Sequence, residues 1–208
     1  MKPPGDNPWL RVPPQDYEAH MGKDGVGQLE PLARALGDAY RETHPSRLLV
    51  LGCGTGNGFA YIDPSRTHVT AVDINRDYQA SARARYPDLA DVTEWVCDAV
   101  EHCRFMRHSF GLIHAGLLFE YVDVATVLGL VSSWLAGDGT LSVVLQVPGD
   151  EPPVSETASE PISQLAAIMR PIEPTSFVEQ AQSHGLALRD TNRISVPRGK
   201  ELWHGLLS

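Results

Sequence analysis

The chain has few cysteines, and they form no recognisable disulfide pattern. Only Cys53, Cys97 and Cys103 occur in 208 residues, an odd number without a Cys-x-x-Cys pair. Such a count does not support the disulfide framework of a small secreted domain. We therefore expect three reduced thiols and a cytoplasmic location, where thiols are kept reduced.

Long apolar segments are also missing. No run approaches the roughly 18 apolar residues that cross a bilayer. We therefore do not expect this chain to be a membrane protein. The first residues, Met-Lys-Pro-Pro-Gly-Asp-Asn-Pro, lack the apolar core of a signal peptide. Both observations agree with a cytoplasmic protein.

Basic residues are outnumbered: 17 Lys and Arg stand against 26 Asp and Glu, for a net charge of −9. An acidic surface repels phosphate backbones, and no Lys/Arg cluster offsets this repulsion. We therefore expect no nucleic-acid partner. The length suits one ordinary domain over residues 1–208, and no internal repeat divides it.

Short apolar runs alternate with segments of helical period, the pattern of a parallel sheet with helices on both faces. The sequence predicts strands at 47–51, 68–73, 92–96, 109–114 and 139–147, and helices at 26–44, 76–86, 124–135, 162–169 and 175–183. Two more β-like runs, 186–196 and 200–207, flank Pro197-Arg-Gly199 and predict an antiparallel hairpin. The expected fold is α/β and Rossmann-like, with a seven-stranded mostly parallel sheet.

Two segments are expected outside this regular core. Residues 1–25 form an N-terminal arm or lid, in which 1–14 are extended and 16–21 form a short helix. Residues 148–161 contain four prolines and predict a mobile loop near the site.

The most informative segment is the glycine loop Leu51-Gly-Cys-Gly-Thr-Gly56, directly after the first strand. Glycines allow sharp turns and let a ligand approach the main chain, and the loop is expected to open a helix. The dinucleotide fingerprint requires G-x-G-x-x-G. Counting from Gly52 its last position is Asn57, and counting from Gly54 it is Phe59, so a nicotinamide cofactor is disfavoured.

An acidic residue follows at a suitable distance. Asp73 ends the second strand, 17 residues after Gly56, where a carboxylate can accept hydrogen bonds from both ribose hydroxyls. The alternative is a plain helix cap, since Asp73 or Asn75 precedes a predicted helix. The glycine loop upstream favours the ribose role.

Together these motifs resemble the class I S-adenosylmethionine-dependent methyltransferases, particularly the small-molecule type 11/12 group. The resemblance runs from about Tyr17 to the end of the chain. Five motifs occur in the family's order: Leu51-Gly-Cys-Gly-Thr-Gly56, Val69-Thr-Ala-Val-Asp73, Trp95-Val-Cys-Asp98-Ala99, Phe110-Gly-Leu-Ile-His114 and Trp134-Leu-Ala-Gly-Asp-Gly139.

The resemblance implies S-adenosylmethionine as cofactor and S-adenosylhomocysteine as product. It implies that Asp73 holds the ribose, that Ile74 packs on the adenine, and that the adenine edge meets the last two residues of the third motif. The whole implied cofactor set is Gly52, Cys53, Gly54, Thr55, Gly56, Asp73, Ile74, Asp98, Ala99 and His114. For Asp98 the alternative is again a helix cap.

Two positions depart from the family pattern. Many members carry an acid two residues before the first glycine, which contacts the methionine amino group; here that residue is Val50. Many also have Asp where this chain has Gly111. Another residue or the N-terminal segment must then supply the amino-group contact.

Methyl transfer requires positioned reactants and at most one base. The candidates are His114, at the end of a central strand, and Tyr17 and His20, in the N-terminal segment. Packing or solvation is the alternative role for both histidines. Glu120 and Tyr121 follow strand four and are expected near the acceptor.

A metal is not expected. His102, Cys103, His108 and His114 have ligand-type side chains, but their spacing matches no zinc pattern.

The sequence therefore predicts an enzyme that methylates a small molecule. The main alternative is a non-catalytic S-adenosylmethionine-binding domain that serves a partner protein. A third is a related enzyme of the same fold, an aminopropyltransferase or a nicotinamide-dependent oxidoreductase.

Overall fold

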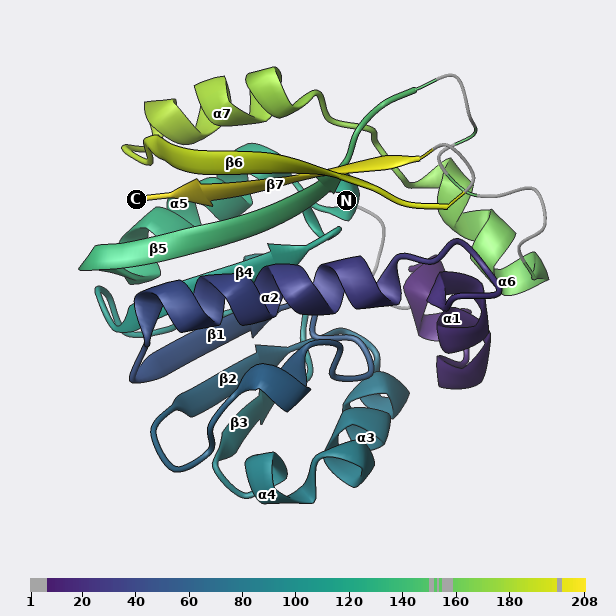
Figure 1. Cartoon of the computed structure of the whole chain (residues 1–208), viewed down its shortest axis with the longest axis horizontal. Coiled ribbons are helices and arrows are strands. Elements are labelled where there is room, and N and C mark those ends of the chain that lie inside the picture. The colour runs from purple at the N-terminus through teal and green to yellow at the C-terminus, as the bar shows by residue number, and fades with distance from the viewer. Residues whose placement is uncertain (1–6, 150–151, 153, 155–158, 198–199) are drawn as a thin grey trace.

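The computed structural model describes residues 7–149, 152, 154, 159–197 and 200–208. Within this part of the chain, seven strands form one sheet in the order β3-β2-β1-β4-β5-β7-β6 (Figure 1). Their bounds are β1 Arg47–Leu51, β2 His68–Val72, β3 Thr93–Val96, β4 Phe110–Gly116, β5 Leu135–Gln146, β6 Leu188–Ser195 and β7 Glu201–Leu207. Strands β1 to β5 are parallel, whereas β7 is antiparallel to β5 and β6. The predicted Rossmann-like sheet with an antiparallel C-terminal hairpin is confirmed.

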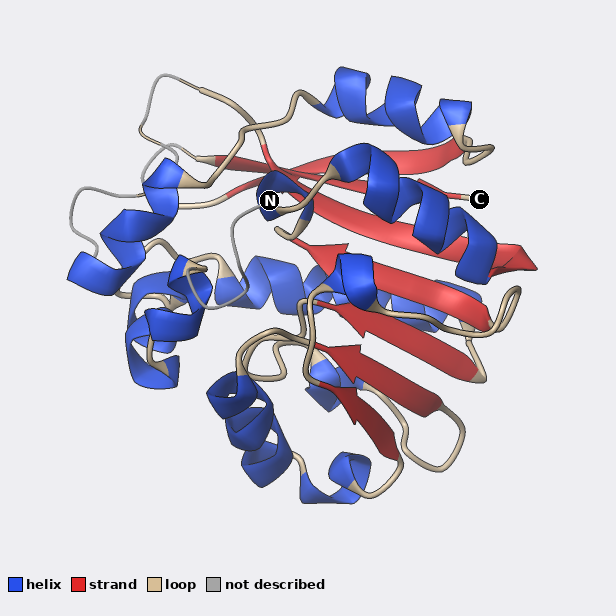
Figure 2. Cartoon of the chain, turned by 180° about the vertical axis from the view of Figure 1, so that it is seen from behind, coloured by secondary structure: helices blue, strands red, loops and turns tan. Residues whose placement is uncertain are grey.

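Helices cover both faces of the sheet, as predicted. Figure 1 shows α2 in front of the strands, and Figure 2, from behind, shows α5 in front of them. The bounds are η2 Pro8–Arg11, α1 Pro14–Met21, α2 Leu29–Thr43, η3 Phe59–Tyr61, α3 Arg76–Arg85, α4 Pro87–Ala90, η4 Val100–His102, η5 Phe119–Tyr121, α5 Val124–Trp134, α6 Glu160–Ser163, η6 Gln164–Ala167 and α7 Pro174–Ser183, where η marks a 3-10 helix.

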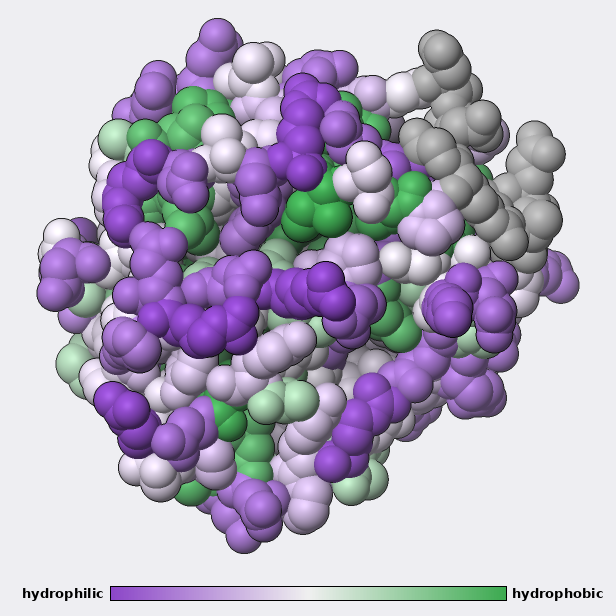
Figure 3. Space-filling view, viewed as in Figure 1, coloured by the Kyte–Doolittle hydropathy of each residue, from purple (hydrophilic) through white to green (hydrophobic). Residues whose placement is uncertain are grey.

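The central strands are buried on both faces, which explains their continuous apolar runs. Leu49 and Leu51 of β1 pack in the core that contains residues of α5 and α7. The alternate residues Leu48 and Val50 pack in the core that contains residues of α2. The opposite side of α2 carries ion pairs such as Arg34–Glu30, and Figure 3 shows a hydrophilic band over this helix.

Two predictions for the central elements were wrong. No α-helix follows the glycine loop: positive φ angles at Gly54, Gly56 and Gly58 lead only into the short η3, because such angles are incompatible with a right-handed helix. Strand β5 begins four residues before the predicted start. Its register with β4 shifts between Phe110 and Leu112, and glycines in β5 permit this irregularity.

The peripheral segments also differ in part from the predictions. Residues 8–11 form η2 rather than an extended arm, because the Asn7 side chain accepts a hydrogen bond from the Trp9 N–H and caps the turn. The predicted helix 162–169 consists of α6 followed by η6. Residues 1–6, most of 150–158 in the predicted mobile loop, and 198–199 in the hairpin turn lie outside the described residues.

Candidate functional site

A cavity of about 1240 Å³ lies at the carboxyl ends of the parallel strands. Each of the first five strands contributes a wall residue at or just after its end: Gly52, Asp73, Cys97, Gly116 and Gln146. The N-terminal segment and residues of α6 and η6 complete the wall. Open α/β sheets bind their ligands at this edge.

The glycine loop contributes main chain to this cavity. Gly52 and Gly54 line it, with φ angles of 68° and 52°. A Cβ atom on Gly54 would stand 3.5 Å from the Tyr17 hydroxyl, so a side chain there would enter the space beneath the N-terminal segment. The positive φ angle therefore favours glycine at position 54, and the absence of a side chain leaves the main chain open to the cavity.

Asp73 is the acid of the site. Its carboxylate accepts the N–H of Gly54 at Oδ2 and the N–H of Asn75 at Oδ1, both at 2.8 Å. Burial raises the pKa of Asp73 to about 6, against the two backbone hydrogen bonds, which lower it. At neutral pH the group is an oriented carboxylate with remaining lone pairs for hydroxyl donors.

The structure brings some of the other predicted cofactor residues to the cavity and leaves others behind it. Ile74, Asp98 and Ala99 line the wall. Asp98 accepts the Ala99 N–H at 2.7 Å and lies 3.1 Å from the His102 ring. The described cavity wall does not include Cys53, Thr55 or Gly56. Thr55 instead donates to the Glu18 carboxylate at 2.6 Å, which joins the loop to α1.

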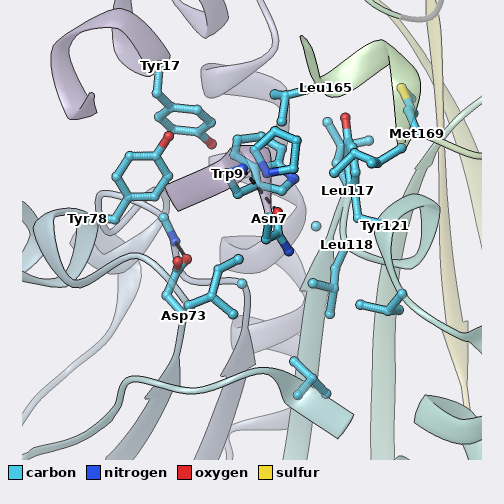
Figure 4. Close-up of a pocket in the computed structure, with 18 of the residues that line it drawn as sticks. Asn7, Trp9, Tyr17, Asp73, Tyr78, Leu117, Leu118, Tyr121, Leu165 and Met169 are labelled. Atoms are coloured by element: carbon cyan, nitrogen blue, oxygen red, sulfur yellow. Dashed lines mark hydrogen bonds between the residues drawn. The ribbon is translucent and has the colours of Figure 1, made fainter. Parts of the chain in front are cut away.

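Four aromatic rings gather at the N-terminal side of the cavity (Figure 4). Trp9 makes edge contacts with Tyr17, Tyr78 and Tyr121 at centroid distances of 6.2, 6.5 and 5.1 Å. Tyr17 also contacts Tyr78 at 5.2 Å. All four rings line the cavity, so a ligand would meet an aromatic surface on this side.

Asn75 connects this aromatic group to the strand that carries Asp73. Its side-chain oxygen caps α3 through the Asp77 N–H, and its side-chain nitrogen donates to the carbonyl groups of Trp9 and Val12. Sequence reasoning recognised Asn75 only as a helix cap and missed Trp9 and Tyr78. The sequence signal was that Trp9 is an aromatic residue in a proline-rich segment. The rings that it contacts lie 8 to 112 residues further along the chain, from Tyr17 to Tyr121.

Tyr17 and His20 both line the cavity, as expected for the N-terminal segment. Burial, together with the nearby Asp73 charge, raises the pKa of Tyr17 far above its ordinary value. Tyr17 therefore remains a neutral hydroxyl at physiological pH, suited to hydrogen bonding rather than to accepting a proton.

His114 lies behind the cavity wall. It is only 5% exposed, and its Nδ1 lies 3.0 Å from the Ser142 hydroxyl. Burial lowers the pKa of His114 to about 3, so the imidazole is neutral at physiological pH. The role of His114 as a cofactor contact or base remains a prediction.

Glu120 is fully buried beside the cavity wall formed by Tyr121 and Gln146. One carboxyl oxygen accepts the Gln146 N–H at 2.8 Å, and the other has no hydrogen-bond partner among the described residues. The Gln146 side chain accepts in turn from Gln28 Nε2 at 3.2 Å. Burial raises the pKa of Glu120 to about 7.

This elevated pKa predicts a pH-dependent stability. The pKa of Glu120 in the folded protein lies above the ordinary value of 4.5, so the unfolded chain loses this proton at a lower pH than the folded protein does. The stability that protonated Glu120 contributes is therefore complete below about pH 4.5 and is lost as the pH rises through 7. Glu120→Gln should therefore flatten the decline in free energy of unfolding between pH 5 and 8, measured by urea denaturation. Asp123→Asn, at a carboxylate whose pKa is lowered, is the control. An unchanged decline in Glu120→Gln would contradict the prediction.

The two departures from the family pattern lie away from the cavity lining. Val50 is 3% exposed and packs in the core with residues of α2. Gly111 lies in β4, where a Cβ atom would stand 3.5 Å from Pro45. Neither position supplies a carboxylate to the cavity.

The four residues weighed as metal ligands are engaged separately. His102 pairs with Asp98, His108 lies 3.1 Å from the Leu135 carbonyl oxygen, and His114 contacts Ser142. Cys103 is buried at the end of η4.

None of the helices in the described part of the chain combines the length and apolar character needed to cross a bilayer.

Comparison with known proteins shows which proteins this chain is similar to. The model of the methyltransferase domain matches residues 49–143. The biotin biosynthesis bifunctional protein BioHC of Cellvibrio japonicus is 25% identical over 84% of this chain and 36% of its own length. The malonyl-[acyl-carrier protein] O-methyltransferase of Bacillus cereus is 31% identical over 53% of this chain and 41% of its own length. The chain thus spans about two fifths or less of the curated relatives it matches.

The fold has solved counterparts as well. Geranyl diphosphate C-methyltransferase from Streptomyces coelicolor superposes with a TM-score of 0.68 at 13% identity, over 86% of this chain and 75% of that chain. The glycine loop, the acid after β2 and the sheet order agree with the match to the domain model. Residues 49–143 of the chain thus match the methyltransferase domain, and the fold is that of a solved methyltransferase.

Proposed function

We propose that this protein is a cytoplasmic enzyme that transfers the methyl group of S-adenosylmethionine to a small molecule with a largely apolar body. The observation that carries the proposal is Asp73, a buried carboxylate held by the Gly54 N–H at the edge of a large cavity. Its two oxygens are oriented by backbone donors, as recognition of a pair of ribose hydroxyls requires.

The cofactor half of the cavity consists of the glycine loop and the ends of β2 and β3. Asp73 would accept the ribose hydroxyls, Ile74 would cover the adenine, and Asp98 with Ala99 would meet its edge. The bound cofactor supplies an electrophilic methyl group on a sulfonium. The Ala99 N–H donates to the exposed Asp98 and orients its carboxyl group, whose oxygens can accept from an amino group.

The acceptor half lies toward η5, η6 and the N-terminal segment. Its wall is mainly apolar and aromatic, and consists of Trp9, Tyr17, Leu117, Leu118, Tyr121, Ile162, Leu165, Ile168 and Met169. The polar groups there include His20 and the hydrogen-bonded pair of Gln28 and Gln146. An acceptor with an apolar body and one or two polar groups fits this lining.

The protein's contribution to catalysis is then mainly positioning. Fixing two reactants in line can lower a barrier by roughly 7–11 kcal/mol without any proton transfer. Trp9 and the tyrosines around it exclude water from the acceptor half, which limits loss of the methyl group to solvent. We extend the proposal to one domain over 1–208, in which residues 1–25 act as a lid.

Two further features support the proposed setting. The net charge of −9 disfavours a nucleic-acid substrate. The three cysteines are free thiols, as in a reducing cytoplasm. The Bacillus cereus relative is an O-methyltransferase of malonyl-[acyl-carrier protein]. A substrate screen should therefore include free carboxylic acids as well as alcohols, phenols and amines.

The first test is thermal unfolding with S-adenosylhomocysteine and, separately, with NAD. A ligand at 100 times its dissociation constant stabilises by roughly 2.7 kcal/mol, which for this length raises the Tm by about 5–10 °C. We expect this rise with S-adenosylhomocysteine alone. Transfer of labelled methyl groups is then measured across the acceptor panel. Binding without any labelled product would support the non-catalytic cofactor-binding domain, and binding of NAD alone would contradict the cofactor assignment.

A further inference from the structure

Three buried polar side chains form a hydrogen-bonded chain across the centre of the sheet. His114 of β4 contacts the Ser142 hydroxyl of β5 at 3.0 Å, and the same hydroxyl contacts His204 Nε2 of β7 at 2.9 Å. Their exposed fractions are 5%, 0% and 6%. Burying three polar groups is costly unless they are paired, so a chain inside an otherwise apolar core calls for a functional explanation.

The inner end of the chain approaches the methyl-acceptor cavity. His114 Nε2 lies 3.3 Å from the position that a Cβ atom on Gly116 would occupy, and Leu32 borders the same space at 3.5 Å. Gly116 and Leu32 both line the cavity. A Cβ atom at position 116 would therefore crowd the ring nitrogen, and glycine lets His114 Nε2 lie directly beside this residue of the cavity wall.

The outer end of the hydrogen-bonded chain is His204, which lies on the same face of the sheet but closer to the edge strand β6. His204 lines a depression of about 320 Å³ between α2 and β6, where the side chains of Glu30 and Arg34 are 66% exposed. Burial lowers the pKa of His204, whereas nearby acidic groups raise it. The acids are Asp38 and Glu42 of α2 and Asp190 of β6.

Two arrangements of protons are compatible with these contacts, because the Ser142 hydroxyl has only one proton to donate. In one of them, His204 carries its proton on Nδ1 and its Nε2 accepts from Ser142, while Ser142 accepts from His114 Nδ1–H. His114 Nε2 is then the nitrogen without a proton, and it is the one beside Gly116.

We propose that His114, Ser142 and His204 form a proton relay from the methyl-acceptor cavity to the depression between α2 and β6. The relay rests on the proposed methyl transfer. As an acceptor hydroxyl or amine gains its methyl group, its bond to hydrogen breaks and the proton passes to His114 Nε2. The Nδ1 proton moves to Ser142, the Ser142 proton moves to His204 Nε2, and the His204 Nδ1 proton leaves to solvent.

The relay suits the surroundings of His114. Burial makes an imidazolium at this position costly, and moving a proton onward avoids storing that charge. His204 and Ser142 are positioning residues, because they act through His114 rather than on the acceptor. Acceptors that are already ionised, such as carboxylates, have no proton to release and do not require the relay.

The first test reads the histidine tautomers by nitrogen-15 NMR in the full-length protein, and it does not depend on knowing the acceptor. We expect His114 to carry its proton on Nδ1 in the native protein. Ser142→Ala should abolish this preference. Thr140→Val is the matched control, since Thr140 is an equally buried β5 hydroxyl that pairs with Arg189 instead. A native His114 with its proton on Nε2, or an unchanged tautomer in Ser142→Ala, would overturn the proposal.

The second test uses turnover once an acceptor that loses a proton is known. Ser142→Ala should lower kcat by about ten- to a hundredfold with little change in the KM for the cofactor, within the range attributed to proton transfer. Gly116→Ala should lower kcat similarly, because its methyl group stands 3.3 Å from Nε2 and blocks the acceptor, while the Ser142 contact keeps the His114 tautomer unchanged. Full turnover in both variants would overturn the relay. Failure to find any product would instead count against the proposed methyl transfer, while the tautomer result stands.

Discussion

Asp73→Ala is expected to lower the affinity for S-adenosylhomocysteine by about 10²- to 10⁴-fold, measured by isothermal titration calorimetry. Each hydrogen bond to a charged group contributes about 1.5–3 kcal/mol, and the proposed ribose contact has two. Asp73 is buried and already oriented by the Gly54 and Asn75 N–H groups, so the native carboxylate needs little reorganisation on binding.

The same substitution leaves both backbone N–H groups without their acceptor, so a lower Tm of the free protein is expected as well. Titrations are therefore made well below the Tm of the variant. Asp123→Asn provides a matched control, because Asp123 lines the same cavity and retains an oxygen for the cap on Thr126. An affinity change below threefold in Asp73→Ala, or an equal loss in the control, would refute the ribose role.

Phe119→Ala is expected to lower the free energy of unfolding by about 3–5 kcal/mol, the usual cost of removing a buried phenylalanine. Phe119 is 1% exposed and contacts Phe177 edge-on at 4.8 Å, and Phe177 contacts Trp203 at 6.2 Å. For this length the corresponding fall in Tm is about 6–20 °C. Differential scanning calorimetry measures it directly.

Phe119 also supports the wall of the cavity. It lies between Leu118, which lines the cavity, and the buried Glu120, so its ring fixes the η5 wall of the acceptor half. Met106→Ala is the control, because Met106 is 75% exposed and its loss should change stability by less than about 0.5 kcal/mol. Equal stabilities of the two variants would show that the η5 wall is not anchored through this core.

The sheet and the cofactor half of the site could be predicted because their signals are local in sequence. A buried strand followed by Gly52-Cys-Gly-Thr-Gly56 and a strand ended by Asp73 are patterns within short windows. The mostly parallel seven-stranded sheet and its antiparallel hairpin were predicted from such windows and are confirmed, whereas the order of the strands was not predicted. The missing helix after the glycine loop was not predicted, because it depends on positive φ angles at successive glycines.

The acceptor half depends on contacts between distant residues, and sequence patterns carry little information about these. Trp9 meets Tyr78 and Tyr121 only after the sheet has formed, and Asn75 must join both regions. The chain of His114, Ser142 and His204 is similar, because one hydroxyl inside an apolar strand gives no pattern of its own.

The hydrogen bonds from Asn75 to the carbonyl groups of Trp9 and Val12 affect how fast a bound product can leave the cavity. The Asn75 side chain holds the N-terminal segment two residues beyond the carboxylate that is proposed to hold the ribose. Release of a spent cofactor would then be coupled to breaking these two hydrogen bonds and withdrawing an indole ring from three tyrosines. Opening motions of this kind set the overall rate of many enzymes. The Asn75 contacts would thus lengthen the residence time of the product, and a weakened Asn75 contact would shorten it.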